Sequence, residues 1–214
     1  MLASSLLVTF IFLKRHLKIN RTGDGGDDSS GADCLVKKDN FMKTSKSKLA
    51  VAPKTYETES DIPKSSRLEL SKLLNLRLAS LVDLQMQMKQ AHWNVKGPSF
   101  IGLHELFDKA AEEVADYVDL VAERISQLGG IAEGTVRVAV SRTRLPEYPL
   151  QIAEGMAHVE AVARALSTFG QEARKTIDEA NALDDADTAD LFTEISRGID
   201  KWLWFVEAHS QAAK

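Results

Sequence analysis

The sequence predicts an all-α protein built on long helices. Residues 103–128 contain neither proline nor glycine, and their apolar side chains recur at the spacing of one helix face. Gly129 and Gly130 follow directly and end this helix. Residues 131–149 then form a connection that is too long for a tight turn between neighbouring helices. We therefore expect a helical bundle that this connection crosses.

The first 64 residues differ in charge from the rest of the chain. They carry 11 basic and 8 acidic side chains, whereas residues 65–214 carry 16 and 23. An acidic body attracts cations and does little to favour nucleic acid. Residues 22–33 are rich in Gly, Asp and Ser and are predicted to be disordered. We expect residues 1–64 to form a disordered or extended N-terminal segment, and residues 65–214 to form one domain.

Residues 2–13 form an apolar run near the start of the chain. The run is shorter than the ~20 residues that span a bilayer, and it lacks the preceding basic region of a secretory signal. Residues 1–41 therefore have three interpretations: a weak anchor or targeting leader, an extension peculiar to this chain, or upstream sequence translated from a wrongly assigned start before Met42. We expect no membrane association, and the single cysteine, Cys34, favours a reducing cytoplasm.

A basic tail follows within the N-terminal segment. Residues 42–56 carry four lysines and no acidic side chain: Lys43, Lys46, Lys48 and Lys54. Such a tail could bind DNA by contacting phosphates without reading the base sequence. The alternative is a tail that only increases solubility. In an oligomer, many copies of the tail would raise the avidity for DNA.

Breaks rich in glycine, proline or aspartate delimit the predicted helices. The first helix presents a broad leucine-rich surface, and we interpret Met86 and Met88 within it as core residues. Residues 97–99 separate it from the second helix. Helices are expected at residues 65–94, 103–128, 152–180 and 188–212, with a short additional helix near residues 135–140.

Two pairs of candidate metal ligands lie on one face of the second helix. His104 and Asp108 are four residues apart, as are Asp119 and Glu123. Asp108 and Asp119 are separated by about three helical turns, so both pairs lie on the same stripe, roughly 16 Å apart along the axis. Metal–ligand bonds of about 2.0–2.2 Å cannot bridge that gap. One metal centre therefore cannot use both pairs of a single chain.

A second copy of the chain resolves this difficulty. Two such helices could pair antiparallel about a two-fold axis near residues 113 and 114. His104 and Asp108 of each chain would then meet Asp119 and Glu123 of its partner, which gives two equivalent sites per dimer. Imidazole and carboxylate ligands together suit iron, manganese or zinc. The alternative is that Asp119 and Glu123 form an ordinary solvated face beside Arg124.

Several motifs resemble those of the Dps family, the DNA-binding proteins from starved cells. The most specific are KQAHWN, which contains His92 and Trp93, and LHExxD, which contains His104 and Asp108. The resemblance covers roughly residues 65–209 and continues in residues 119–124, 127–130, 150–180, 187–190 and 200–207. It implies a ferritin-like four-helix bundle with a long crossover between its second and third helices, and assembly into a hollow shell of twelve subunits.

The resemblance also implies a chemistry. Proteins of this family oxidise ferrous iron at a di-iron site shared between two subunits, with hydrogen peroxide as the preferred oxidant, and store the ferric product as a mineral. Trp93 could be oxidised in place of DNA, although packing is an alternative role. The implied iron ligands are His92, His104 and Asp108 of one subunit with Asp119 and Glu123 of its partner.

Other residues and other function classes fit parts of the sequence. An intrachain di-iron site of the ferritin type needs Glu-x-x-His pairs, and no glutamate here has a histidine three residues later. We interpret His158 and His209 as surface or interface residues. The protein could instead be mainly a DNA-compacting particle, or a metal-storage shell without fast catalysis. Five acids either line a pore for iron or begin a helix favourably: Asp184, Asp185, Asp187, Asp190 and Glu194.

Overall fold

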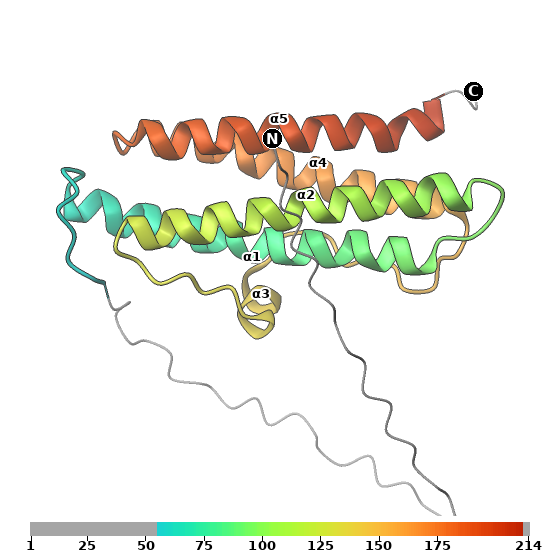
Figure 1. Cartoon of the computed structure of the whole chain (residues 1–214), viewed down its shortest axis with the longest axis horizontal. Helices are drawn as coiled ribbons and strands as arrows, with labels where there is room; N and C mark the ends of the chain where they lie inside the picture. Colours follow the sequence, from blue (N-terminus) through green and yellow to red (C-terminus); the bar gives the residue numbers. More distant parts are fainter. Residues whose placement is uncertain (1–54, 212–214) are drawn as a thin grey trace, which may run out of the picture. The chain divides into compact units, whose positions relative to one another are not determined.

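The computed structural model describes residues 55–211, so residues 1–41 and the lysines of the basic tail lie outside the described residues. The described part contains five α-helices and no β-strand (Figure 1). This confirms the predicted all-α class. In chain order the helices are α1 (Lys64–Asn94), α2 (Phe100–Gln127), α3 (Val136–Arg142), α4 (Gly155–Asn181) and α5 (Ala186–Gln211).

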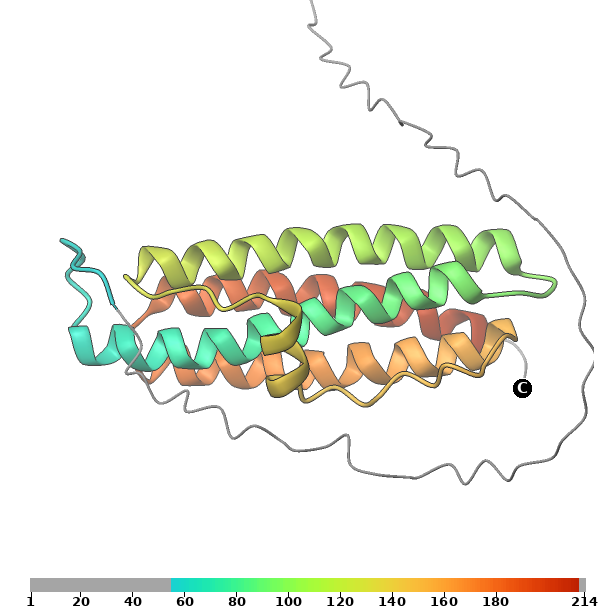
Figure 2. The same ribbon diagram turned by 90° about the horizontal axis from the view of Figure 1, so that it is seen from below.

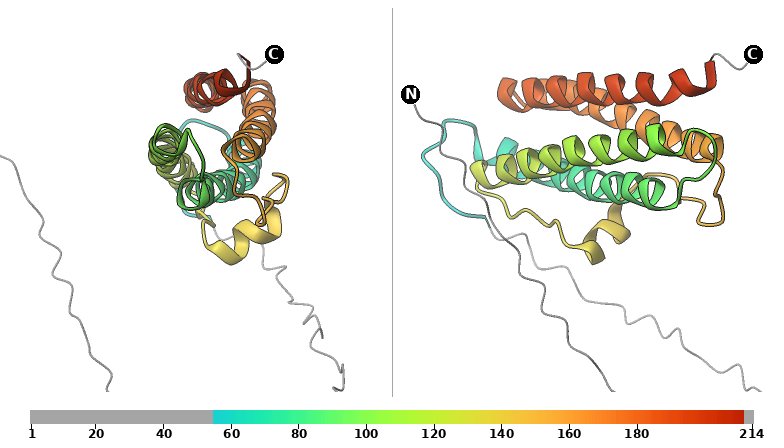
Figure 3. Two further views of the ribbon diagram at one scale, coloured as in Figure 1. Left: turned by 90° about the vertical axis from the view of Figure 1, so that its right-hand side faces the viewer. Right: turned by 45° about the vertical axis from the view of Figure 1, so that its right-hand side comes forward.

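The four long helices form a bundle made of two hairpins. One hairpin consists of α1 and α2, the other of α4 and α5, and α1 packs against α4. Seen end-on in Figure 3, the four helices surround a common core and α3 lies outside them, against α1. Figure 2 shows the long connection that carries α3 along the outside of the bundle from the end of α2 to the start of α4. The crossover is therefore present as predicted.

Aliphatic and aromatic side chains from all four long helices fill the core. The largest fully buried ones include Phe107, Phe169 and Phe192, which come from α2, α4 and α5 and meet the leucines of α1. Burying such side chains stabilises a fold by roughly 1.5–3 kcal/mol each. No helix among the described residues is both long and apolar enough to cross a membrane.

The turn between α1 and α2 is fixed from outside the hairpin. Gly97 adopts a positive φ of 108°, which a residue with a side chain rarely tolerates. The backbone N–H of Lys96 donates to the carbonyl of Ala153, 2.9 Å away, just before α4. The turn is thereby tied to the end of the crossover, so the ends of α1 and α2 are held against a second part of the chain.

Two predictions for single residues were wrong. Met86 is 47% exposed, whereas Met88 is fully buried, because the two positions face different sides of α1. His158 is fully buried and not at the surface, since its Nδ1 lies 2.5 Å from the hydroxyl of Tyr148 in the crossover. His209 is exposed on α5, as expected.

Candidate metal centre

Two histidines face each other where α1 ends and α2 begins. The rings of His92 and His104 are stacked, with centroids 3.7 Å apart. Each Nδ1 lies 2.8 Å from the backbone carbonyl oxygen of the other histidine. A carbonyl only accepts, so each Nδ1 carries a proton and donates it, which leaves Nε2 as the nitrogen of each ring that can offer a lone pair to a metal. Both rings are thus held in the tautomer that binds a metal through Nε2.

Asp108 lies one turn further along α2 and completes a cluster with these histidines. Its Oδ1 is 3.9 Å from Nδ1 of His92 and only 2.5 Å from Nζ of Lys89. The hydrogen bond from Lys89 is the main reason that the pKa of Asp108 is lowered from its usual value. The carboxylate is therefore charged and already holds one cation, the ammonium of Lys89.

Lys89 is the first residue of the KQAHWN motif, but the sequence analysis predicts no role for it. Lys89 precedes His92 by three positions on α1, so both residues lie on one helix face. This spacing of three residues is the sequence signal that places Lys89 near His92. What the sequence could not reveal is that the lysine reaches across the hairpin to Asp108 on α2.

Asp119 and Glu123 lie on α2 far from the histidines of the same chain. Both side chains are exposed. In the described chain, no three His, Cys, Asp or Glu side chains are arranged to hold a metal ion. His92, His104 and Asp108 thus lie close together in one chain without converging on a metal position, and Asp119 and Glu123 are not added to them. Trp93, next to His92, is 58% exposed.

The acids near the start of α5 divide into two kinds. Asp185 is buried, accepts from Nη2 of Arg124 at 2.6 Å and from the backbone N–H of Thr188 at 3.1 Å, and so begins the helix. Burial alone raises its pKa, but the hydrogen bonds from Arg124 and Thr188 lower the pKa on balance. The other four remain exposed: Asp184, Asp187, Asp190 and Glu194.

Comparisons with known proteins agree with this architecture. Residues 71–214 match the family model described as a ferritin-like domain. The chain is 42% identical over 158 residues to the DNA protection during starvation protein of Agrobacterium fabrum, covering 74% of this chain and 98% of that protein. Among solved structures, it is similar to DpsA14 from Streptomyces coelicolor (TM-score 0.70, 34% identity, covering 74% of this chain and 94% of the other). It is also similar to Mycobacterium smegmatis Dps (TM-score 0.69, 32% identity, covering 73% and 94%). The chain belongs to the Dps family of ferritin-like proteins.

Proposed function

We propose that this protein is a ferroxidase and iron-storage shell protein that oxidises Fe(II), preferably with hydrogen peroxide, and so protects DNA from oxidative damage. The observation that carries this proposal is the histidine pair at the α1–α2 turn. Its reciprocal hydrogen bonds leave the Nε2 atoms of both His92 and His104 free to bind ferrous iron beside the carboxylate of Asp108.

The complete site is proposed to need two subunits. His92, His104 and Asp108 would supply one half, and Asp119 and Glu123 of the partner subunit the other. Two features support this division. The two pairs share a stripe of α2, and the acids at its far end are exposed and so are available to a second chain. The mixed nitrogen and oxygen ligands suit iron.

Iron is the substrate of the proposed reaction. Two Fe(II) ions give one electron each to hydrogen peroxide, whose O–O bond breaks, and with water the ferric product forms oxyhydroxide and releases protons. The carboxylates offset the positive charge of the two ions, with Asp108 and Glu123 of the partner subunit as candidate bridges. Lys89 must release Asp108 when iron binds, because the ammonium and the metal compete for one carboxylate.

The proposal includes assembly and location. We expect a homo-oligomeric shell of twelve subunits in the cytoplasm, where the ferric mineral is stored inside the shell. Trp93 is exposed beside His92 and could be oxidised in place of DNA. The exposed acids Asp184, Asp187, Asp190 and Glu194 are candidates for the lining of a pore.

A second candidate function is non-specific DNA compaction. The similar Agrobacterium fabrum protein is named for DNA protection during starvation. The basic tail of residues 42–56 is the part of this chain suited to phosphate contacts. Deleting residues 42–56 should abolish a gel shift with duplex DNA and leave iron oxidation unchanged. Undiminished DNA binding by the truncated protein would exclude the tail as the DNA-binding element.

Iron loading tests the main function. The protein is loaded anaerobically with Fe(II), treated with peroxide and desalted over a chelator. Tens of iron ions retained per chain in a large particle would support a mineralising shell, whereas one or two would indicate binding without storage. A double variant, His104→Ala with Asp108→Ala, should slow iron oxidation sharply, and His209→Ala serves as the control because His209 is exposed on α5. An unchanged oxidation rate in the double variant would refute the site.

A further inference from the structure

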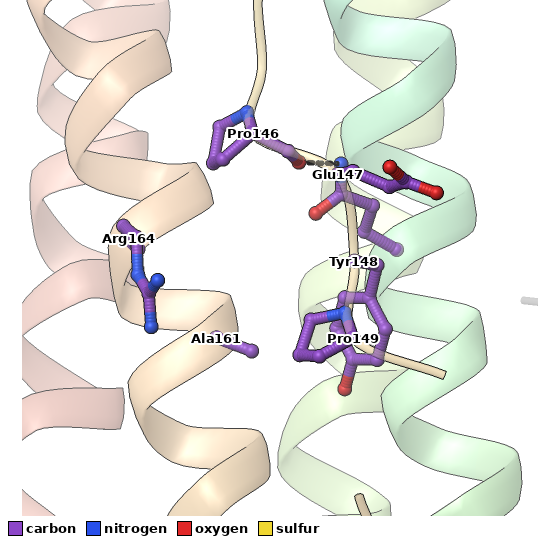
Figure 4. Close-up of a pocket in the computed structure, with 7 residues that line it drawn as sticks. Pro146, Glu147, Tyr148, Pro149, Ala161 and Arg164 are labelled. Atoms are coloured by element: carbon purple, nitrogen blue, oxygen red, sulfur yellow. Dashed lines mark hydrogen bonds between the residues drawn. The ribbon is translucent and has the colours of Figure 1, made fainter. Parts of the chain in front are cut away.

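Tyr148 and His158 form a buried pair near the α1–α2 turn and have no part in the function proposed above. The hydroxyl of Tyr148 lies 2.5 Å from Nδ1 of His158, which is in the first turn of α4. Tyr148 is 8% exposed and His158 is fully buried. Figure 4 shows Tyr148 in the wall of a shallow pocket between the crossover and α4, across from Ala161 and Arg164.

The proton of this hydrogen bond belongs to the tyrosine in the resting protein. Burial raises the pKa of the Tyr148 hydroxyl and lowers the pKa of the His158 imidazole, so both groups are neutral at pH 7. The hydroxyl therefore donates, and Nδ1 accepts. No other base in the described chain is hydrogen-bonded to this hydroxyl.

His158 lies near the candidate metal centre, and its second nitrogen has no hydrogen-bond partner within the described residues. Since Nδ1 accepts, Nε2 carries the ring proton, and this nitrogen is buried with no hydrogen bond of ordinary geometry within the described residues. The turn between α1 and α2 is bound to the segment before α4, since the backbone N–H of Lys96 donates to the carbonyl of Ala153, 2.9 Å away. Lys96 follows His92 by four residues and His158 follows Ala153 by five, so the pair lies near the turn that carries an iron ligand.

We propose that Tyr148 is a redox-active tyrosine that donates one electron to the iron site while His158 takes its proton. This inference rests on the proposed ferroxidase function. The tyrosine–histidine pair would act when a site holds one Fe(II) ion and not two. Peroxide needs two electrons, so a single ferrous ion leaves the reaction one electron short and would release a hydroxyl radical.

In this step Fe(II) becomes Fe(III) and Tyr148 becomes a neutral tyrosyl radical. The O–O bond of hydrogen peroxide breaks, and the two electrons convert it to two hydroxide ions. The tyrosine proton moves to Nδ1 of His158, which becomes an imidazolium. Proton transfer along an existing 2.5 Å hydrogen bond matters because tyrosine is oxidised far more easily when its proton leaves together with the electron. No hydroxyl radical is released.

Freeze-quench electron paramagnetic resonance tests the assignment directly. The full chain is loaded anaerobically with one Fe(II) per subunit, mixed with peroxide and frozen. The sequence holds three tyrosines, Tyr56, Tyr117 and Tyr148, so single Phe variants can assign a radical. Tyr117→Phe is the matched control, since Tyr117 is also buried but donates to a carboxylate, Glu113, at 2.5 Å.

We expect a tyrosyl signal in the wild type and in Tyr117→Phe, and its loss in Tyr148→Phe. His158→Leu and His158→Gln should both lose the signal, because a glutamine amide can accept the hydrogen bond but neither side chain can take the proton. Spin trapping should detect more hydroxyl radical from Tyr148→Phe than from Tyr117→Phe. A tyrosyl signal that persists in Tyr148→Phe, or its absence from wild-type protein that does oxidise iron, would overturn this inference alone. If the wild type oxidises no iron, the ferroxidase proposal fails with it.

Discussion

His92 and His104 are twelve residues apart, and the turn between α1 and α2 brings their rings into contact. Each ring also satisfies a backbone carbonyl at the end of the opposite helix. The pair therefore closes the hairpin and fixes its own tautomers with the same two bonds. Lys89 adds a charge to this arrangement, since its ammonium holds Asp108 in place before any metal arrives.

The contact between Lys89 and Asp108 leads to a prediction about metal affinity. Replacing Lys89 by Met should tighten ferrous binding severalfold, because the metal no longer displaces an ammonium and no longer meets its charge. A partly exposed ion pair is worth about 1 kcal/mol or less, which sets this modest size. Anaerobic calorimetry with Fe(II) measures the change, and Lys72→Met, at an exposed position of α1, is the control. Weaker binding in Lys89→Met would show that the lysine chiefly positions Asp108.

The sequence predicts these residues unevenly. Helical spacing pairs His104 with Asp108, and the resemblance to Dps proteins adds His92 to them; the structure brings the three close together. The burial of His158 was not foreseen, because its partner Tyr148 lies on the crossover, where no periodicity reports which side chains face inward. Met86 was misplaced for a related reason: a helix that is apolar over a broad surface does not reveal which apolar positions lie at its edge.

At the scale of elements, the helix boundaries show what local signals can decide. The helices begin and end within a few residues of the predicted positions, because glycines, prolines and aspartates punctuate the chain. The largest shifts are three residues: α2 begins at Phe100 and not at residue 103, and so includes Gly102, and α4 begins at Gly155 and not at residue 152. A glycine within a helix costs only about 1 kcal/mol, which the rest of α2 outweighs.

The link between α2 and α5 gives a prediction about pH. Asp185→Asn keeps the shape of the side chain but removes its charge beside Arg124. We expect a loss of about 2–3 kcal/mol at pH 7, less than the usual 3–5 kcal/mol for a broken buried pair, because Arg124 retains contact with solvent and with Asp187. The pKa of Asp185 is lower in the folded protein, so this stabilisation is present above the unfolded pKa of about 3.9 and disappears as the pH falls through the folded value.

Thermal unfolding measured across pH tests this expectation. The melting temperature of Asp185→Asn should lie well below that of the wild type at pH 7, and the two should converge in acid. Asp184→Asn is the control, because Asp184 is exposed and its φ of 58° suits asparagine. A difference between Asp185→Asn and wild type that stays constant down to the lowest pH would mean that packing, and not the charge, is what Asp185 contributes.

At the scale of the whole molecule, the proposed site combines two pairs of residues that lie apart on α2. Their separation along α2 is a consequence of helix geometry alone, and it is the reason that the proposed site needs a second chain. The need for a second chain is a prediction from the sequence, since spacing along a helix converts directly into distance. The arrangement of the two chains relative to each other is a matter of side-chain packing between surfaces, which no periodicity encodes.

Complementation between two inactive variants tests the shared site. One variant carries His104→Ala and Asp108→Ala, and the other carries Asp119→Ala and Glu123→Ala. In a mixed dimer the first variant supplies intact acids and the second supplies intact His92, His104 and Asp108, so one of the two sites is whole. Random pairing of equal amounts makes about half of the dimers mixed, which restores about a quarter of the wild-type sites.

Co-expressed variants should therefore oxidise Fe(II) with peroxide at about a quarter of the wild-type rate per chain, while each variant expressed alone stays inactive. A site contained within one chain gives a different result, because every chain in the mixture is then defective and no rate returns. The size of the restored rate also discriminates further. Pairing of a different symmetry, in which each chain meets its donor and its acceptor in different neighbours, also gives a quarter in a closed shell. An isolated dimer of that kind has one site and not two, so even wild-type dimers would then show only half the rate per chain of wild-type shells. Measuring the rate on shells and on dimers separated by size therefore decides both whether the site is shared and whether the two-fold pairing creates it.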